Sequence, residues 1–117
     1  MQSIGIIPLD ERPVNTRYPA MIAAIAGANV RMPPVELLSA GRTPAPAEPL
    51  IAWLHDMAPE LDGLIVSCEM LGYGGLIASR IGNESAATVL RRLDELREVR
   101  RRLPQLPIYG FNVITRV

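Results

Sequence analysis

Residues 3–12, "SIGIIPLDER", join a short apolar run to three charged side chains. The first part, residues 3–8, is rich in isoleucine and apolar on both alternating faces, which is typical of a strand that is buried on two sides. Asp10, Glu11 and Arg12 follow almost at once. A connecting turn needs Gly, Asn or Pro, but it does not need this density of charge. The stretch therefore predicts a buried strand with a polar site at its carboxyl end.

The rest of the chain alternates between strand-like and helix-like patterns. The predicted strands are residues 3–8, 29–34, 62–68 and 107–117, and the predicted helices are residues 19–27, 50–58 and 84–103. The first helix has Met21, Ile22 and Ile25 on one side, and the last has Asn83 as its expected N-cap. Residues 35–49 and 69–83 are expected to be loops, because proline or glycine interrupts them. This alternation predicts an α/β fold with a parallel sheet of βα repeats.

Two parallel architectures fit four βα steps. A (β/α)8-type barrel usually takes about 250 residues, so we expect residues 1–117 to be its N-terminal half. Because the sequence stops on a strand that feeds no helix, we expect a chain truncated at its C-terminus. It would then be one portion of a single larger domain, with the C-terminal remainder of its own chain as a partner. The alternative is a small doubly wound parallel sheet.

Composition excludes several classes of function. The 12 basic and 12 acidic residues balance to a net charge of zero, so no general attraction to nucleic acid or to an anionic membrane is expected. No apolar run approaches the roughly 20 residues of a membrane span. The N-terminus lacks a basic leader, and the single Cys68 excludes an internal disulfide. We expect a cytoplasmic protein.

Polar side chains collect after the predicted strands, where parallel folds bind their ligands. Asp10 and Glu69 are the candidate catalytic residues. The candidate substrate-binding residues are Glu11, Arg12, Asn15, Arg17, Tyr73, Arg80, Asn112 and Arg116. Structural roles are open for several of them: Asp10 could brace the turn and pair with Arg12, the arginines could brace other parts of the protein, and Tyr73 could cover the rim of the fold.

The sequence requires no cofactor. His55, the single histidine, lies beside Asp56 in a predicted helix and is expected at the surface, away from the strand ends. With one histidine and one cysteine, no zinc site is predicted, whereas a divalent metal bound by carboxylates stays open. Residues 72–75, "GYGG", permit close backbone approach but form neither a dinucleotide fingerprint nor a Walker loop. Cys68 is expected to be a small buried thiol.

Two longer motifs carry a resemblance to a known family. "PLDERPVNTRYP" (residues 8–19) and "SCEMLGYGGLIASR" (residues 67–80), joined by "MPP" (residues 32–34) and followed by "IYGFNVITR" (residues 108–116), resemble the N-terminal region of the bacterial domain-of-unknown-function 4127 family. The resemblance covers essentially all 117 residues. It implies a protein several times longer than a half-barrel, and it implies no established reaction. Where the family pattern generally has an aspartate after the serine strand, this sequence has Glu69, whose reach is one methylene longer.

Two functional hypotheses follow. The first is an enzyme that acts on a polar small molecule, such as a glycoside or sugar-acid hydrolase, in which Asp10 and Glu69 act as acid and base. Arg12, Arg17 and Arg80 would hold an anion or hydroxyls. The alternative is a non-catalytic metabolite-binding module built from the same groups. An enzyme needs one carboxylate whose pKa is displaced towards neutrality, and a binding module does not.

Overall fold

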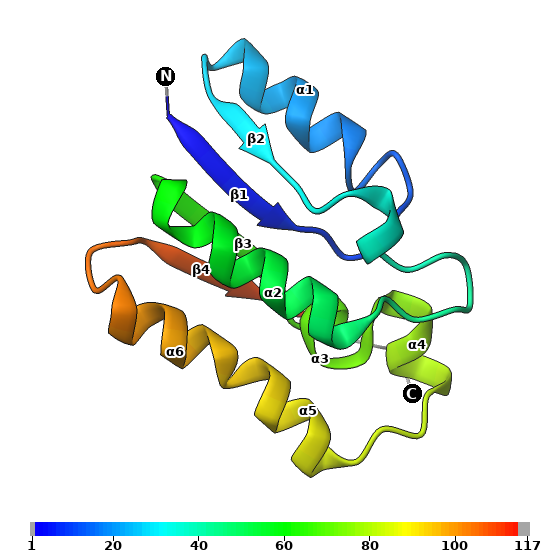
Figure 1. Ribbon diagram of the computed structural model, residues 1–117. Helices are drawn as coiled ribbons and strands as arrows, with labels where there is room; N and C mark the ends of the chain where they lie inside the picture. The colour runs from blue at the N-terminus through cyan, green and yellow to red at the C-terminus, as the bar shows by residue number, and fades with distance from the viewer. Residues whose placement is uncertain (1, 115–117) are drawn as a thin grey trace.

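Four parallel strands form one sheet in the order β2-β1-β3-β4 (Figure 1). The computed structural model describes residues 2–114. The strands are β1 (Ser3–Ile7), β2 (Asn29–Arg31), β3 (Gly63–Ser67) and β4 (Ile108–Phe111). The helices are α1 (Arg17–Ile25), α2 (Ala47–Met57), α3 (Cys68–Tyr73), α4 (Leu76–Ile81), α5 (Ala86–Leu93) and α6 (Glu95–Arg102), with two short 3-10 helices at Val35–Leu37 and Ala58–Glu60. The predicted α/β class with parallel βα repeats is confirmed.

The strand order distinguishes the two architectures that the sequence allowed. In a barrel, strands that follow one another in sequence are also neighbours in the sheet. Here β1 lies between β2 and β3, with Ile4 opposite Val30 and Ile6 opposite Ile65. The order differs from that of a barrel and follows the doubly wound alternative, in which the first strand is central. The edges of the sheet are β2 and β4.

One face of the sheet carries the hydrophobic core. Ile7, Leu64 and Val66 are fully buried on this face. Leu50 and Leu54 of α2 belong to the same buried cluster and are themselves inaccessible to solvent. Figure 1 shows α2 lying across the front of β3 and β4, with α5 and α6 beside it. Burying each such side chain stabilises the fold by about 1.5–3 kcal/mol, so this layer holds the strand ends in place.

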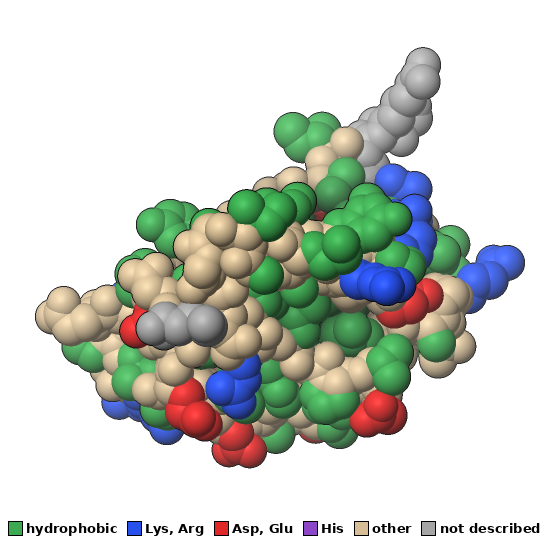
Figure 2. Space-filling model, turned by 90° about the horizontal axis from the view of Figure 1, so that it is seen from above, with side chains coloured by type: hydrophobic (Ala, Val, Ile, Leu, Met, Phe, Trp, Pro, Cys, Tyr) green, Lys and Arg blue, Asp and Glu red, His purple; other side chains and the backbone are tan. Residues whose placement is uncertain are grey.

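The opposite face is largely open. From β1, the chain crosses to β2 at one edge of the sheet. From β2, it crosses back past β1 to β3. Because such crossovers are right-handed, α1 and α2 lie on opposite faces of the sheet. The predicted apolar side of α1 is exposed, including Met21, Ile22 and Ile25, and α1 buries none of its residues. Tyr109 is exposed on β4, and hydrophobic side chains reach the surface seen in Figure 2.

Several predicted boundaries were wrong, most clearly those of a loop and of the last helix. Residues 69–83, expected to be a loop, contain α4 and most of α3. Ser67 caps α3 by accepting a hydrogen bond from the Met70 N–H at 3.2 Å, and Gly74 ends it in the left-handed region at φ 95°. Such caps allow short helices that show no periodicity in the sequence.

The long helix predicted for residues 84–103 is divided at Asp94 into α5 and α6. Its cap is Ser85 rather than Asn83, because the Ser85 hydroxyl accepts from the Thr88 N–H at 3.1 Å.

Within residues 2–114, no helix combines the length and the apolar character that a membrane crossing requires.

Candidate functional site

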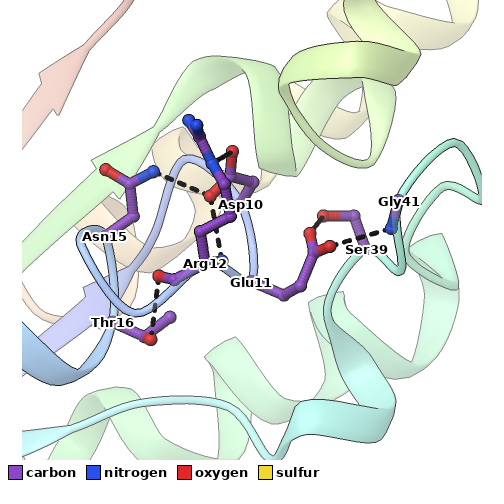
Figure 3. Close-up of polar contacts among 7 residues, drawn as sticks. All are labelled: Asp10, Glu11, Arg12, Asn15, Thr16, Ser39 and Gly41. Atoms are coloured by element: carbon purple, nitrogen blue, oxygen red, sulfur yellow. Dashed lines mark hydrogen bonds and ion pairs between the residues drawn. The ribbon is translucent and has the colours of Figure 1, made fainter.

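The loop after β1 is organised around the Asp10 carboxylate (Figure 3). Asp10 is buried, and Arg12 donates to it twice, from its backbone N–H at 3.1 Å and from Nε at 2.8 Å. Asn15 donates a third hydrogen bond from Nδ2 at 2.7 Å. The bond from the Arg12 backbone N–H is one in which a side-chain oxygen accepts from the backbone two residues later, and such bonds stabilise turns. The Asp10 side chain therefore fixes the path of the loop as it leaves the strand.

Glu11 joins this loop to the segment that follows β2. Its Oε1 accepts from the Ser39 hydroxyl at 2.7 Å, and its Oε2 accepts from the Gly41 N–H at 2.8 Å (Figure 3). Partial burial on its own would raise the pKa of Glu11, but the hydrogen bonds from Gly41 and Ser39 outweigh it and hold the pKa below its ordinary value of 4.5. Glu11 is thus stabilised as a carboxylate.

A pocket of about 230 Å³ opens between these loops and α4. It is lined by Asp10, Glu11, Arg12, Ser39, Gly41, Leu76, Ile77 and Arg80. The lining combines segments that follow β1, β2 and β3, so the pocket lies at the carboxyl ends of the strands. Charged groups line part of it, and two aliphatic side chains of α4 line another part.

The position of this pocket follows from the strand order. The connection after β1 leads to α1 on one face of the sheet, and the connection after β3 leads towards the layer on the other face. In doubly wound sheets, ligands bind in the crevice outside the carboxyl ends of the strands, where the connections diverge in this way. The pocket contains residues that follow both β1 and β3, the two strands at this switch point.

A larger pocket of about 370 Å³ lies at the opposite end of the sheet. It is lined mainly by apolar residues and prolines around Leu61 and Leu106, near the amino ends of β3 and β4. We favour the smaller pocket as the functional site, because parallel sheets bind ligands at the carboxyl ends and because the smaller pocket gathers four charged side chains.

Glu69 lies in the first turn of α3 and connects it to the segment after β4. Its Oε2 accepts from the Val113 N–H at 2.7 Å, and the Ser67 hydroxyl approaches Oε1 at 3.4 Å. Glu69 is buried and does not line the 230 Å³ pocket. Burial, together with the neighbouring charge of Glu69, raises the pKa of the Cys68 thiol, which is therefore not an activated nucleophile.

The structure brings four of the predicted site residues together: Asp10, Glu11, Arg12 and Arg80 line one pocket. The others lie elsewhere. Asn15 supports Asp10, Arg17 is the exposed first residue of α1, Tyr73 is the half-buried last residue of α3, and Asn112 is exposed after β4. Arg116 lies outside the described residues.

Sequence reasoning missed Ser39, Gly41, Leu76 and Ile77. They lie in segments that were expected to be loops without a role. The one feature of the sequence that could have indicated them was the pair of small residues, Ser39 and Gly41, soon after a predicted strand end.

His55 differs from its expected surface position. It is half-buried between α2 and α6, where its Nε2 lies 2.8 Å from Glu95 Oε1 and its Nδ1 lies 3.1 Å from Arg102 Nη1. These contacts give it a packing role far from the pocket. Among residues 2–114, no three acidic, histidine or cysteine side chains are grouped closely enough to hold a metal ion.

The comparisons with known proteins identify a family and no activity. No curated protein and no solved structure matches this chain. Residues 4–117 match the family described as "Protein of unknown function (DUF4127)". Since the match covers nearly the whole sequence, in agreement with the two motifs that flank the pocket, the chain belongs to the DUF4127 family.

Proposed function

We propose that this chain forms the binding site for a polar small molecule at the carboxyl ends of β1 and β3. The observation that carries the proposal is the 230 Å³ pocket at the switch point of the sheet. Its volume is below the roughly 300–1,000 Å³ of pockets for drug-sized ligands, which favours a compact metabolite.

The lining suits a ligand with both polar and apolar surface. Arg12 and Arg80 offer guanidinium donors, and Leu76 with Ile77 offers an aliphatic wall. Binding sites of this kind fix the orientation of a ligand with few polar groups and exclude water with apolar ones. The hydrogen bonds of Glu11 to Ser39 and Gly41 hold two sides of the pocket together before any ligand arrives. Such preorganisation reduces the entropy cost of binding.

The carboxylates support binding more than catalysis. A general acid at neutral pH needs a raised pKa, whereas the pKa of Glu11 is lowered. The Asp10 oxygens already accept three hydrogen bonds within the loop. Glycoside hydrolysis requires two carboxyl groups on either side of the scissile bond, and Glu69 is not part of the pocket lining. We therefore favour the metabolite-binding module, and the hydrolase remains a hypothesis for Asp10 and Glu69.

A pocket-filling variant tests this proposal. The purified protein is screened by thermal shift and calorimetry against sugars, sugar acids and sugar phosphates. A ligand of the pocket should bind the wild type and should lose its affinity in Ile77→Trp, whose new indole occupies the pocket. Ile81→Trp is the matched control, because Ile81 is similarly exposed on the same helix (49% against 40%) but does not line the pocket.

Two results would count against the binding module. If every ligand of the screen bound Ile77→Trp and the wild type equally, the pocket would not be the site. If the protein hydrolysed a glycoside and lost that activity in Glu69→Gln, the hydrolase hypothesis would replace it.

A further inference from the structure

We infer that the ligand of this pocket carries a carboxylate or phosphate group, bound by Arg80 together with the terminal nitrogens of Arg12. The inference rests on the proposed function, because it assigns a chemical class to the ligand of the same pocket. It depends on which of the four charged groups in the lining are already engaged by the protein and which are not.

The two carboxylates are engaged. Asp10 accepts hydrogen bonds from Arg12 and Asn15, and Glu11 accepts from Ser39 and Gly41. A carboxylate that is satisfied by protein donors gains less from a cationic ligand than a bare one does, because the ligand would compete with bonds that already exist. A cation is therefore not the ligand that this lining favours.

The two guanidiniums are more available. Arg12 uses Nε to reach Asp10, and its side chain is 58% exposed. Within residues 2–114, neither the terminal nitrogens of Arg12 nor any side-chain nitrogen of Arg80 makes a hydrogen bond or ion pair. Arg80 extends from the last turn of α4 and lines the same pocket. A guanidinium presents paired N–H groups that match the geometry of carboxylate and phosphate oxygens.

Glu11 restricts how the anion can lie. Its negative charge repels a second anion, so the anionic group of the ligand is placed towards the arginines and away from the Ser39 side. A carboxylate has about four lone-pair positions, and the bonds from Ser39 and Gly41 occupy two of them. The remaining positions can accept hydroxyl groups of the ligand. A small polyhydroxy acid or its phosphate ester has this combination of an anion at one end and hydroxyls along its length.

Charge removal at Arg80 tests the inference by calorimetry on the purified protein. The probes are D-gluconate, inorganic phosphate and sorbitol, the last being the neutral analogue of gluconate. We expect the wild type to bind at least one anion more tightly than sorbitol, and Arg80→Gln to bind that anion about tenfold to a hundredfold more weakly. The control is Arg97→Gln, which removes the same charge from an exposed position on α6 and should leave affinity unchanged. Raised salt should also weaken binding of the anion.

The probes distinguish a carboxylate ligand from a phosphate ester. They also distinguish a failure of this inference from a failure of the proposed function. Preference for gluconate indicates a carboxylate ligand, and preference for phosphate indicates a phosphate ester. Equal affinity for sorbitol and gluconate, or an unchanged affinity in Arg80→Gln, would overturn the inference. If sorbitol binding were nevertheless abolished by Ile77→Trp, the pocket would still bind a polar ligand. If no anion bound at millimolar concentration, the inference would also fail. The proposed function would fail with it only if the wider metabolite screen gave no ligand of the pocket either.

Discussion

Asp10 is a buried carboxylate whose partners all lie within the next five residues of the chain. The sequence left two roles open for it, a site carboxylate or a brace for the turn. The hydrogen bonds from Arg12 and Asn15 favour the brace, although Asp10 also borders the pocket. The two roles predict different losses on substitution, since a brace contributes to stability and a site carboxylate contributes to binding or catalysis.

We expect Asp10→Asn to lower the free energy of unfolding by about 1–3 kcal/mol, because the Arg12 guanidinium loses its ionic partner and a loop donor loses its acceptor. Urea denaturation of the wild type and the variant measures this loss. Asp56→Asn is the control, because Asp56 is exposed on α2 and its carboxylate accepts no hydrogen bond from the described residues. Unchanged stability with complete loss of ligand binding would instead make Asp10 a site residue.

Glu11 predicts a dependence of stability on pH. Its pKa is lower in the folded protein than the ordinary value of 4.5, so folding favours the ionised form. A depressed pKa contributes stability that is fully present above the unfolded pKa and is lost as the pH falls through the folded pKa. The contribution of Glu11 should therefore be constant near neutrality and disappear below pH 4.5.

The substitution Glu11→Gln isolates this contribution. The difference in unfolding free energy between the wild type and the variant should be largest at neutral pH and should shrink as the pH falls below 4.5. Glu36→Gln serves as the control, since Glu36 is exposed and makes no hydrogen bond or ion pair within the described residues. A difference that stayed constant across this range would show that Glu11 carries no charge-dependent stability.

At the scale of elements, the sequence located the strands better than the short helices. Strands β1 and β3 are continuous apolar runs, which is a local signal. Helices α3 and α4 have six residues each, which is too short for an apolar period to repeat. Their boundaries depend on the caps and on contacts with distant residues. For the same reason, the sequence did not indicate that Leu76 and Ile77 line the pocket.

Gly74 is the junction on which the α3–α4 pair depends. It adopts φ 95°, and its N–H bonds to the carbonyls of Glu69 and Met70. A Cβ at this position would lie 2.6 Å from Pro44 Cβ and 2.8 Å from the Ala45 nitrogen. The Gly74 carbonyl also accepts from the Ala45 N–H at 2.9 Å, so the junction fixes the segment that leads into α2.

We expect Gly74→Ala to destabilise the protein through two effects, backbone strain and steric overlap. Gly27→Ala separates them, because Gly27 has a similar φ of 80° and no atom within 4 Å of the added Cβ. Gly27→Ala should cost about 1–2 kcal/mol from the left-handed backbone alone. Gly74→Ala should cost about 1–3 kcal/mol more, because Pro44 and Ala45 cannot move away freely. Equal losses in thermal or urea denaturation would show that the overlap at Gly74 is relieved without cost.

At the scale of the whole molecule, the order of the strands is what the sequence could not decide. Alternating strands and helices predict parallel βα units, but periodicity contains no information about which strands pair. β1 is apolar enough to be central or terminal, and only its pairing with both β2 and β3 settles the question. The pocket depends on that pairing. The sequence placed Asp10, Glu11, Arg12 and Arg80 among the candidates, but it did not separate them from Glu69 or Asn112, which lie outside the pocket lining.

The strand order also determines which face and which edges of the sheet are exposed. Parallel sheets occur almost only with both faces covered, yet here α1 buries none of its residues and Tyr109 of β4 is 66% exposed. Within residues 2–114, the sheet edges β2 and β4 present unpaired backbone groups. An apolar face next to an open edge favours association with another chain or segment.

We therefore expect residues 1–117, expressed alone, to associate as concentration rises, as measured by light scattering during gel filtration. Tyr109→Lys should reduce this association, because it places a charge on the open face beside the β4 edge. Leu90→Lys is the matched control, since Leu90 is 61% exposed on α5, which belongs to the helices on the core side of the sheet. It should leave association unchanged. A monodisperse monomer with a cooperative melt at all concentrations would contradict this prediction and would show that the four-stranded sheet is stable with one face open.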